Sequence, residues 1–330
     1  MKRLGTMILV VCCLTLGHVS AQTPQARLTV EVRNNTANGA PVASDEVALH
    51  LYRGQQQIDV RPAKVGEDGK AVFENVSTGQ DISAVARVKH QNMFFRSRPV
   101  PLNSAAGEFS ANVQVFDVSN DASKLSVGTH HLMVALRGEA LEFTEYLQLK
   151  NSSDKAVIGS ERDAQDRPVV VRFVLPEGFR DLAESSYLEP EALVITEEGF
   201  YDTLAVPPGE HQVAFSYKLD LGRGATRVAK EITLPTSQLM IFWEHGQGAL
   251  EGLGEPSNRL TSAASVPIEY YRRSNLQPGD RITFRISGFN AKKKSDASTW
   301  IILGVVFAVI VIVALLRMLP KPTESGQTHG

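Results

Sequence analysis

The stretch Gln212–Leu219, with the sequence QVAFSYKL, decides the fold class of this chain. From Val213 to Leu219 every second side chain is large and apolar, and small or polar side chains lie between them. Successive side chains of a β-strand point to opposite faces, so this period of two indicates a strand with one buried face. The same alternation recurs in three earlier stretches, which are centred on Val30, Val134 and Val171.

Short turn sequences separate the predicted strands, namely Asn38-Gly39, Asp68-Gly69, Pro208-Gly209, Gly222–Gly224 and Pro278-Gly279-Asp280. The sequence between them contains no amphipathic helix of about 12 or more residues and no strand–helix–strand rhythm. A strand with one apolar face must bury that face against a second sheet. The sequence therefore predicts an all-β protein of antiparallel sheets, packed as immunoglobulin-like β-sandwiches.

A secretory signal is expected at the N-terminus. Lys2 and Arg3 precede an apolar run from Leu4 to Leu16, and the small residues a signal peptidase recognises follow at Val19–Ala21. This order is typical of a cleaved signal peptide over residues 1–21.

Both cysteines, Cys12 and Cys13, fall inside that signal. The mature chain, beginning at Gln22, should then contain no cysteine. This expectation excludes disulfides, thiol catalysis and cysteine-based metal sites together.

A second apolar run, Trp300–Leu316, carries no charged residue. As a helix it would be about 26 Å long, which is close to the thickness of a bilayer core. The sequence predicts one C-terminal transmembrane helix over residues 300–319. Because the signal exports everything before it, residues 320–330 should form a short cytoplasmic tail. We expect a single-pass protein of a bacterial cell membrane, with its ectodomain in the periplasm or outside.

Polar segments divide the expected ectodomain. The stretch 119–128 interrupts the strand pattern and is predicted as a linker after a first domain at residues 22–118. Residues 129–289 form a second β-sandwich region, as one sandwich or as two, so the ectodomain has two or three in all. The segment 290–299, with three consecutive lysines, is predicted as a juxtamembrane linker.

The first domain carries a family resemblance in residues 66–88, GEDGKAVFENVSTGQDISAVARV. The pattern of Asp68-Gly69, Ala71, Phe73, Val76 and Gly79 resembles the carboxypeptidase regulatory-like, or transthyretin-like, β-sandwich family. The resemblance covers about residues 26–118. It implies that the Asp-Gly turn opens a strand, that Phe73 enters the core, and that the domain is a non-catalytic accessory, stalk or binding module. The second region contains Leu147–Asn151, Arg167-Pro168, the segment FVLPEGF at 173–179 and AVPPGEHQVAFSY at 205–217. On these residues it is similar to repeated sandwich regions of bacterial envelope proteins.

Motifs that carry chemistry are missing from the sequence. No histidine has the neighbours of a zinc peptidase motif, and neither a nucleophile elbow nor a phosphate-binding loop is present. His130 and His131 are adjacent, so on a strand they point to opposite faces and cannot both bind one ion. The sequence predicts no catalytic residue, no metal ligand and no cofactor, and hence not an enzyme. A net charge of -2, without a basic block, gives no footprint for nucleic acid.

Three aromatic residues are the candidate binding residues, namely Trp243, Tyr270 and Tyr271. Aromatic rings can line a carbohydrate or peptide surface through stacking, or they can pack within the core and on a sheet face.

Three functions are compatible with these observations. The first is a non-catalytic envelope protein whose β-sandwich ectodomain supports or binds another envelope protein. The second is a binding module for a small molecule or a glycan. The third is an enzyme with an unrecognised site, although no nucleophile and base can be named for it. In all three the membrane is a partner through the single C-terminal span.

Overall fold

The computed structural model describes residues 25–103, 107–222, 224–261 and 267–288. These residues are all-β: apart from two short 3-10 turns, Ala122–Lys124 and Pro190–Ala192, every regular element is a strand. Within these ranges no helix is long and apolar enough to cross a membrane. The predicted signal peptide, juxtamembrane linker, transmembrane helix and cytoplasmic tail lie outside the described residues.

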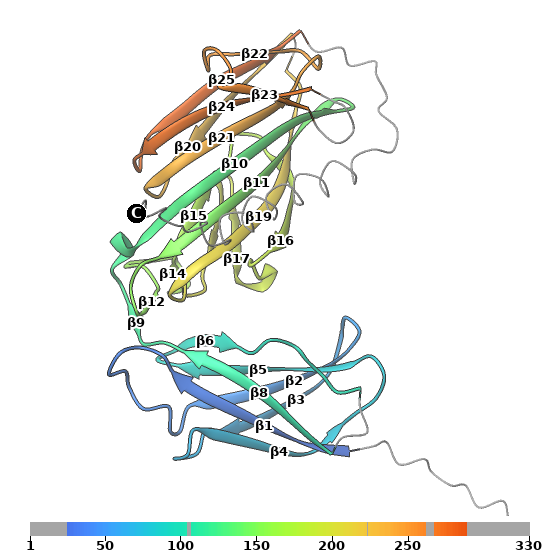
Figure 1. The fold of residues 1–330 in the computed structure, drawn as a ribbon, viewed down its shortest axis with the longest axis vertical. Coiled ribbons are helices and arrows are strands. Elements are labelled where there is room, and N and C mark those ends of the chain that lie inside the picture. Colours follow the sequence, from blue (N-terminus) through green and yellow to red (C-terminus); the bar gives the residue numbers. More distant parts are fainter. Residues whose placement is uncertain (1–24, 104–106, 223, 262–266, 289–330) are drawn as a thin grey trace, which may run out of the picture. The chain divides into compact units, whose positions relative to one another are not determined.

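The chain divides into two compact units (Figure 1). Of the described residues, those within 25–33, 41–89 and 95–115 belong to the first unit, and those within 34–40, 90–94 and 116–288 belong to the second. Residues 119–128, predicted as a linker, include the end of β9 (Val118–Ser119), the first 3-10 turn and the start of β10 (Leu125–Arg137).

Two sheets pack face to face in the first unit. One has the order β4-β1-β8, with bounds Lys70–Ser77, Gln25–Asn34 and Glu108–Val115. The other has the order β3-β2-β5-β6, with bounds Gln56–Lys64, Glu46–Arg53, Ile82–His90 and Met93–Arg96, and β7 (Val100–Pro101) pairs with β5. Buried side chains alternate along both sheets, so their apolar faces form a common core.

The turn between β3 and β4 confirms the expected role of Phe73. Gly69 has a φ of +75°, and a Cβ there would lie 3.2 Å from the carbonyl oxygen of Val32, so glycine is required. The strand that follows buries Ala71 and Phe73 on one face, and Phe73 is 5% exposed. The intervening Val72 points outward and is 41% exposed.

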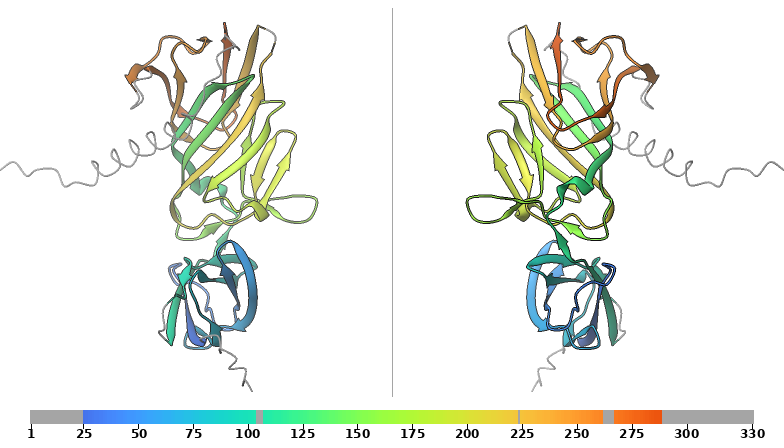
Figure 2. Two further views of the ribbon diagram at one scale, coloured as in Figure 1. Left: turned by 90° about the vertical axis from the view of Figure 1, so that its right-hand side faces the viewer. Right: turned by 90° about the vertical axis from the view of Figure 1, so that its left-hand side faces the viewer.

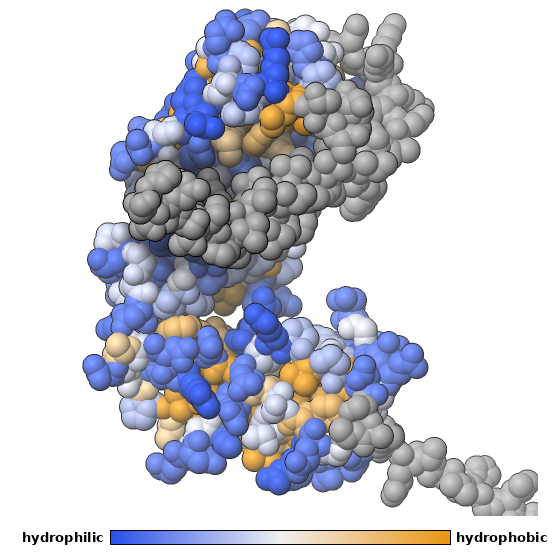
Figure 3. All heavy atoms as spheres, in the orientation of Figure 1, coloured by the Kyte–Doolittle hydropathy of each residue, from blue (hydrophilic) through white to orange (hydrophobic). Residues whose placement is uncertain are grey.

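Strand β3 is an edge strand that carries partly exposed charged side chains on the side of the sheet that faces the core. Asp59 and Arg61 lie opposite the buried Leu51 and Leu49 of β2. The Arg61 guanidinium donates to Asp59 at 2.8 Å and to the carbonyl oxygens of Glu74 and Asn75 at 3.0 and 2.9 Å. Inward charges protect an edge against pairing with another chain. Figure 3 shows apolar residues, in orange, lying among polar residues, in blue, on the visible surface of the protein.

The second unit is built on a seven-stranded sheet of order β16-β19-β11-β10-β21-β24-β23. Apart from β10, these strands are β16 (Arg180–Ser186), β19 (Gly209–Asp220), β11 (Ala140–Asn151), β21 (Thr236–Glu244), β24 (Pro267–Leu276) and β23 (Asn258–Thr261). Strands β10 and β21 run parallel, which corrects the expectation of purely antiparallel sheets. After β19 the chain crosses to the opposite layer through β20 and returns at β21, and such a crossover permits parallel pairing.

Two three-stranded sheets form that opposite layer, which Figure 2 shows in two side views. Their orders are β15-β18-β17 (Val171–Val174, Gly199–Asp202 and Leu193–Thr196) and β20-β25-β22 (Ala225–Glu231, Arg281–Ser287 and Ala249–Glu251). Two small pairs, β12-β9 (Ala156–Val157 with β9) and β13-β14 (Glu161–Arg162 with Pro168–Val169), complete the unit.

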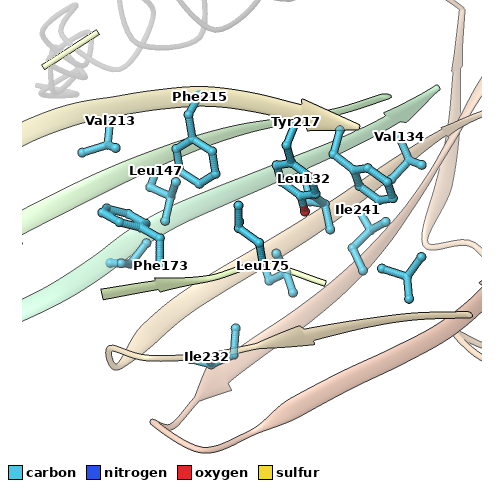
Figure 4. Close-up of a cluster of buried hydrophobic side chains, with 14 of the residues drawn as sticks. Leu132, Val134, Leu147, Phe173, Leu175, Val213, Phe215, Tyr217, Ile232 and Ile241 are labelled. Atoms are coloured by element: carbon cyan, nitrogen blue, oxygen red, sulfur yellow. The ribbon is translucent and has the colours of Figure 1, made fainter. Parts of the chain in front are cut away.

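One contiguous core runs through the second unit, from Leu125 on β10 to Ile286 on β25. In Figure 4, Phe215 and Tyr217 of β19 face Phe173 of β15 and Leu175 just beyond that strand. The described residues between 129 and 288 therefore contribute side chains to one hydrophobic cluster.

A β-bulge in β10 decides which of its side chains enter this core. From Val127 to His130 the strand advances three residues while its partner β11 advances two, from Leu149 to Leu147. The extra residue reverses the alternation, so Val127 and His130 both point inward although they are three positions apart.

We predict that Phe73→Ala destabilises the first unit by about 3–5 kcal/mol, because it leaves a cavity in a small core. Hydrogen exchange of the whole chain should show faster exchange across the first unit and unchanged exchange in the second. Val72→Ala, at the exposed neighbour, is the matched control and should cost less than about 0.5 kcal/mol. Equal effects of the two variants would contradict the assignment of Phe73 to the core.

Candidate functional site

The inner side of the seven-stranded sheet contains a fully buried polar cluster centred on Glu145 of β11. Its carboxylate accepts hydrogen bonds from the Tyr217 hydroxyl at 2.9 Å and from His130 Nε2 at 2.7 Å. Lys230 of β20 approaches both carboxylate oxygens, at 2.9 and 2.8 Å, and also donates to the carbonyl oxygen of Val174 at 3.2 Å. All three donor side chains are nearly inaccessible to water.

Lys230 keeps this carboxylate ionised. Burial alone would raise the pKa of Glu145, but the Lys230 charge and the His130 hydrogen bond outweigh burial and lower it to about 2. Burial lowers the pKa of His130 despite its bond to Glu145. An ionised carboxylate only accepts hydrogen bonds, so the neutral His130 ring must carry its proton on Nε2. The cluster is then one anion, one cation and two neutral donors, with no net charge.

A small cavity of about 20 Å³ lies beside this cluster, lined by His130, Lys230 and Phe173 among others. That volume is enough for one water molecule and for no larger ligand. The cluster therefore joins the two layers of the sandwich, and its geometry offers no room for a substrate.

The opposite side of the same sheet is the candidate functional site. Six side chains from four neighbouring strands meet there, and we call them the outer face: Tyr146, His131, Met133, Met240, Phe242 and Tyr270. Strand register places His131 between Tyr146 and Met240, and Phe242 between Met133 and Tyr270. All six are partly exposed.

Aromatic contacts organise the outer face. The ring of His131 meets Phe242 edge-on at 5.4 Å, and Phe242 lies 5.7 Å from Tyr270. Burial, and to a lesser extent the neighbouring His130, lowers the pKa of His131 to about 4, and burial raises the pKa of Tyr146. Both side chains are neutral at pH 7, so the centre of this face carries no charge.

Charged residues lie around the outer face. Arg272 stacks over the Tyr270 ring at 6.0 Å, and Glu244 pairs with Arg137 at 3.8 Å at the other end. Glu142 lies beyond Thr144 on β11, and Leu260 of β23, 45% exposed, continues the apolar surface. An apolar, aromatic and methionine-containing centre with a polar rim is the anatomy of a protein–protein interface.

The three predicted binding residues do not share a surface. Trp243 is 1% exposed in the core, and Tyr271 is buried on the same side, with its hydroxyl 3.3 Å from Glu269. Only Tyr270 belongs to the outer face. Sequence reasoning missed Phe242, Met240 and the β10 residues. The signal was available in HHLMVAL and MIFWE, because these strands are apolar on both faces.

His130 and His131 point to opposite faces, as the alternation of a strand requires. Among the described residues, no three histidine, cysteine, aspartate or glutamate side chains are grouped so that they could hold a metal ion.

The fold and this surface define an all-β protein of two sandwich units, the second of which carries a partly apolar outer sheet face. In sequence, the chain matches no protein-family model and no curated protein.

Among solved structures, the chain is similar to the full-length major pilin SpaD from Corynebacterium diphtheriae, at 12% identity and a TM-score of 0.23, over 80% of this chain and 81% of that one. It is also similar to a DUF3823 family protein from Parabacteroides merdae, at 14% identity and a TM-score of 0.20, over 63% of this chain and 91% of that one. With scores this low, the fold assignment rests on the sheets described above.

We predict that Lys230→Met destabilises the second unit by about 3–5 kcal/mol, because it leaves an unpaired buried carboxylate. The double variant with Glu145→Gln should lose less than the sum of the two single variants, since no isolated charge remains. Denaturant unfolding followed by Trp243 fluorescence measures all three. Arg281→Met is the control: it removes an exposed pair with Glu231 at 3.1 Å and should cost at most about 1 kcal/mol. A loss no larger than the control's would contradict this role of Lys230.

We also predict that the second unit loses stability between pH 7 and pH 4. The pKa values of His130 and His131 are lower in the folded chain than the ordinary 6.5, so protons bind the unfolded chain first and favour unfolding. Asp202 opposes this trend: burial raises its pKa to about 6, so its contribution to stability grows as pH falls. Urea midpoints at pH 7, 5 and 4 should fall, and fall less in His131→Phe. Identical pH dependence in the variant would contradict this role of His131.

Proposed function

We propose that this chain is a non-catalytic, single-pass envelope protein that binds another envelope protein through the outer face of its second unit. The observation that carries the proposal is the outer face itself: neutral aromatic and methionine side chains gather there with charges at the rim. The first unit, with the features of a carboxypeptidase regulatory-like domain, serves as an accessory or stalk module. The predicted signal and membrane span support the assignment to the envelope.

The composition of the outer face supports binding rather than simple exposure. The solvent side of an antiparallel sheet usually carries polar residues. Here the solvent side of three neighbouring strands carries apolar and aromatic residues instead, namely Met133, Met240, Phe242 and Tyr270. The other side of the same strands faces the hydrophobic core. Partly exposed apolar groups of this kind mark sites of association.

The form of the surface favours a protein partner over a small molecule or a glycan. Small ligands bind in concave pockets of some hundreds of Å³. The outer face is a regular sheet surface, and two of the three aromatic residues that could stack on a sugar, Trp243 and Tyr271, are buried. A sheet surface with an apolar centre matches a second folded surface.

We predict that a photo-reactive phenylalanine analogue at position 242 forms a covalent adduct with a partner protein in cells that make the chain natively. The same analogue at Ile195, which is 65% exposed on β17 and away from the outer face, is the matched control and should form none. Adducts would be detected as a mass shift with an antibody against the chain. Equal labelling from both positions, or from neither, would contradict the proposed function.

A further inference from the structure

The charges at the rim of the outer face are arranged so that the face is complementary to itself. Arg272 lies at one corner, on β24, and Glu142 lies at the opposite corner, on β11. Across the sheet they are three strand spacings apart, and along the strands they are four residues apart. Each of these two separations is about 14 Å.

Both charges lack an ionic partner within the described part of the chain. The Arg272 guanidinium contacts the Tyr270 ring but no carboxylate there. Glu142 lies opposite Lys218 in register, but Lys218 donates to Asp181 at 3.0 Å instead. Glu244, by contrast, is paired with Arg137. The face thus presents one unpaired cation and one unpaired anion on a diagonal, with an uncharged centre between them.

We infer that the partner on the outer face is a second copy of this chain, bound about a two-fold axis. This inference rests on the proposed function and names its partner. A two-fold axis along the other diagonal, from Tyr146 towards Ile268, brings Arg272 of each copy against Glu142 of the other. Both unpaired charges are then satisfied twice, and the interface uses the same surface on both copies, as two-fold symmetry requires.

The centre of the face fits this arrangement. Met133 and Phe242 lie side by side on β10 and β21, near the middle of the diagonal. The symmetry places each copy's Phe242 against the other's Met133, and a thioether against an aromatic ring is a favourable contact. Strands of the two sheets would cross at nearly a right angle, which is one of the two usual sheet packings.

Charge reversal of the full-length chain in mild detergent tests the inference, with the mass followed by sedimentation equilibrium. The chain should be a dimer. Arg272→Glu and Glu142→Arg should each raise the dimer dissociation constant about tenfold or more, because each variant opposes like charges at two contacts. An equimolar mixture of the two variants should restore the dimer, since every contact in the mixed dimer again joins opposite charges.

Two control variants separate the face from the rest of the chain. Arg285→Glu reverses another exposed arginine, on β25, which also forms no ion pair among the described residues, and it should leave the dimer intact. Phe242→Glu should give monomers, whereas Ile195→Glu should not. A dimer that survives Phe242→Glu, a mixture that fails to recover, or a chain that is monomeric throughout would overturn the inference.

Photo-crosslinking at position 242 separates this inference from the proposed function. An adduct of twice the mass of the chain supports both. An adduct with a different protein, from a chain that is monomeric, overturns the second copy as partner but leaves the proposed function standing. The absence of any adduct overturns both.

Discussion

The buried ion pair between Glu145 and Lys230 is the constraint on which the second unit depends. A carboxylate in the middle of a seven-stranded sheet is tolerable only if a cation reaches it, because an isolated buried charge costs several kcal/mol. Lys230 comes from one three-stranded sheet and also binds the Val174 carbonyl of the other. Three sheets of the second unit therefore meet at one carboxylate. The two layers must be placed so that Lys230 reaches Glu145, because the buried carboxylate would otherwise have no cation beside it.

The central strands consequently separate two kinds of environment by the thickness of a single sheet. On the inner side, His130 is buried and bonds to Glu145 through its Nε2. On the outer side, its neighbour His131 packs against Phe242 among partly exposed residues. The core and the proposed binding surface thus lie on opposite faces of the same strands, so substitutions on the outer face should leave the core complete.

Much of this fold could be predicted from alternation, and particular residues show where that reasoning ends. Strand β19 alternates large and small side chains, so its buried face was evident. Strand β21 is apolar on both faces, so nothing local distinguishes the buried Trp243 from the partly exposed Phe242. The partners Glu145 and Lys230 are 85 residues apart and carry no local pattern. The family resemblance, the membrane span and the identity of the partner remain predictions.

The bulge between Val127 and His130 has a consequence for how this protein can change. Side chains of a strand alternate between its two faces with a period of two residues, and the extra residue near Gly128 shifts this alternation once. Deleting one residue there would remove the bulge and leave Val127 and His130 on the inner face, whereas inserting one would send His131 and Met133 into the core and turn His130 and Leu132 towards the solvent. No set of point substitutions in β10 acts on so many contacts together. Among descendants of this sequence, this short segment should therefore tolerate an added residue less readily than a change in the identity of any residue within it.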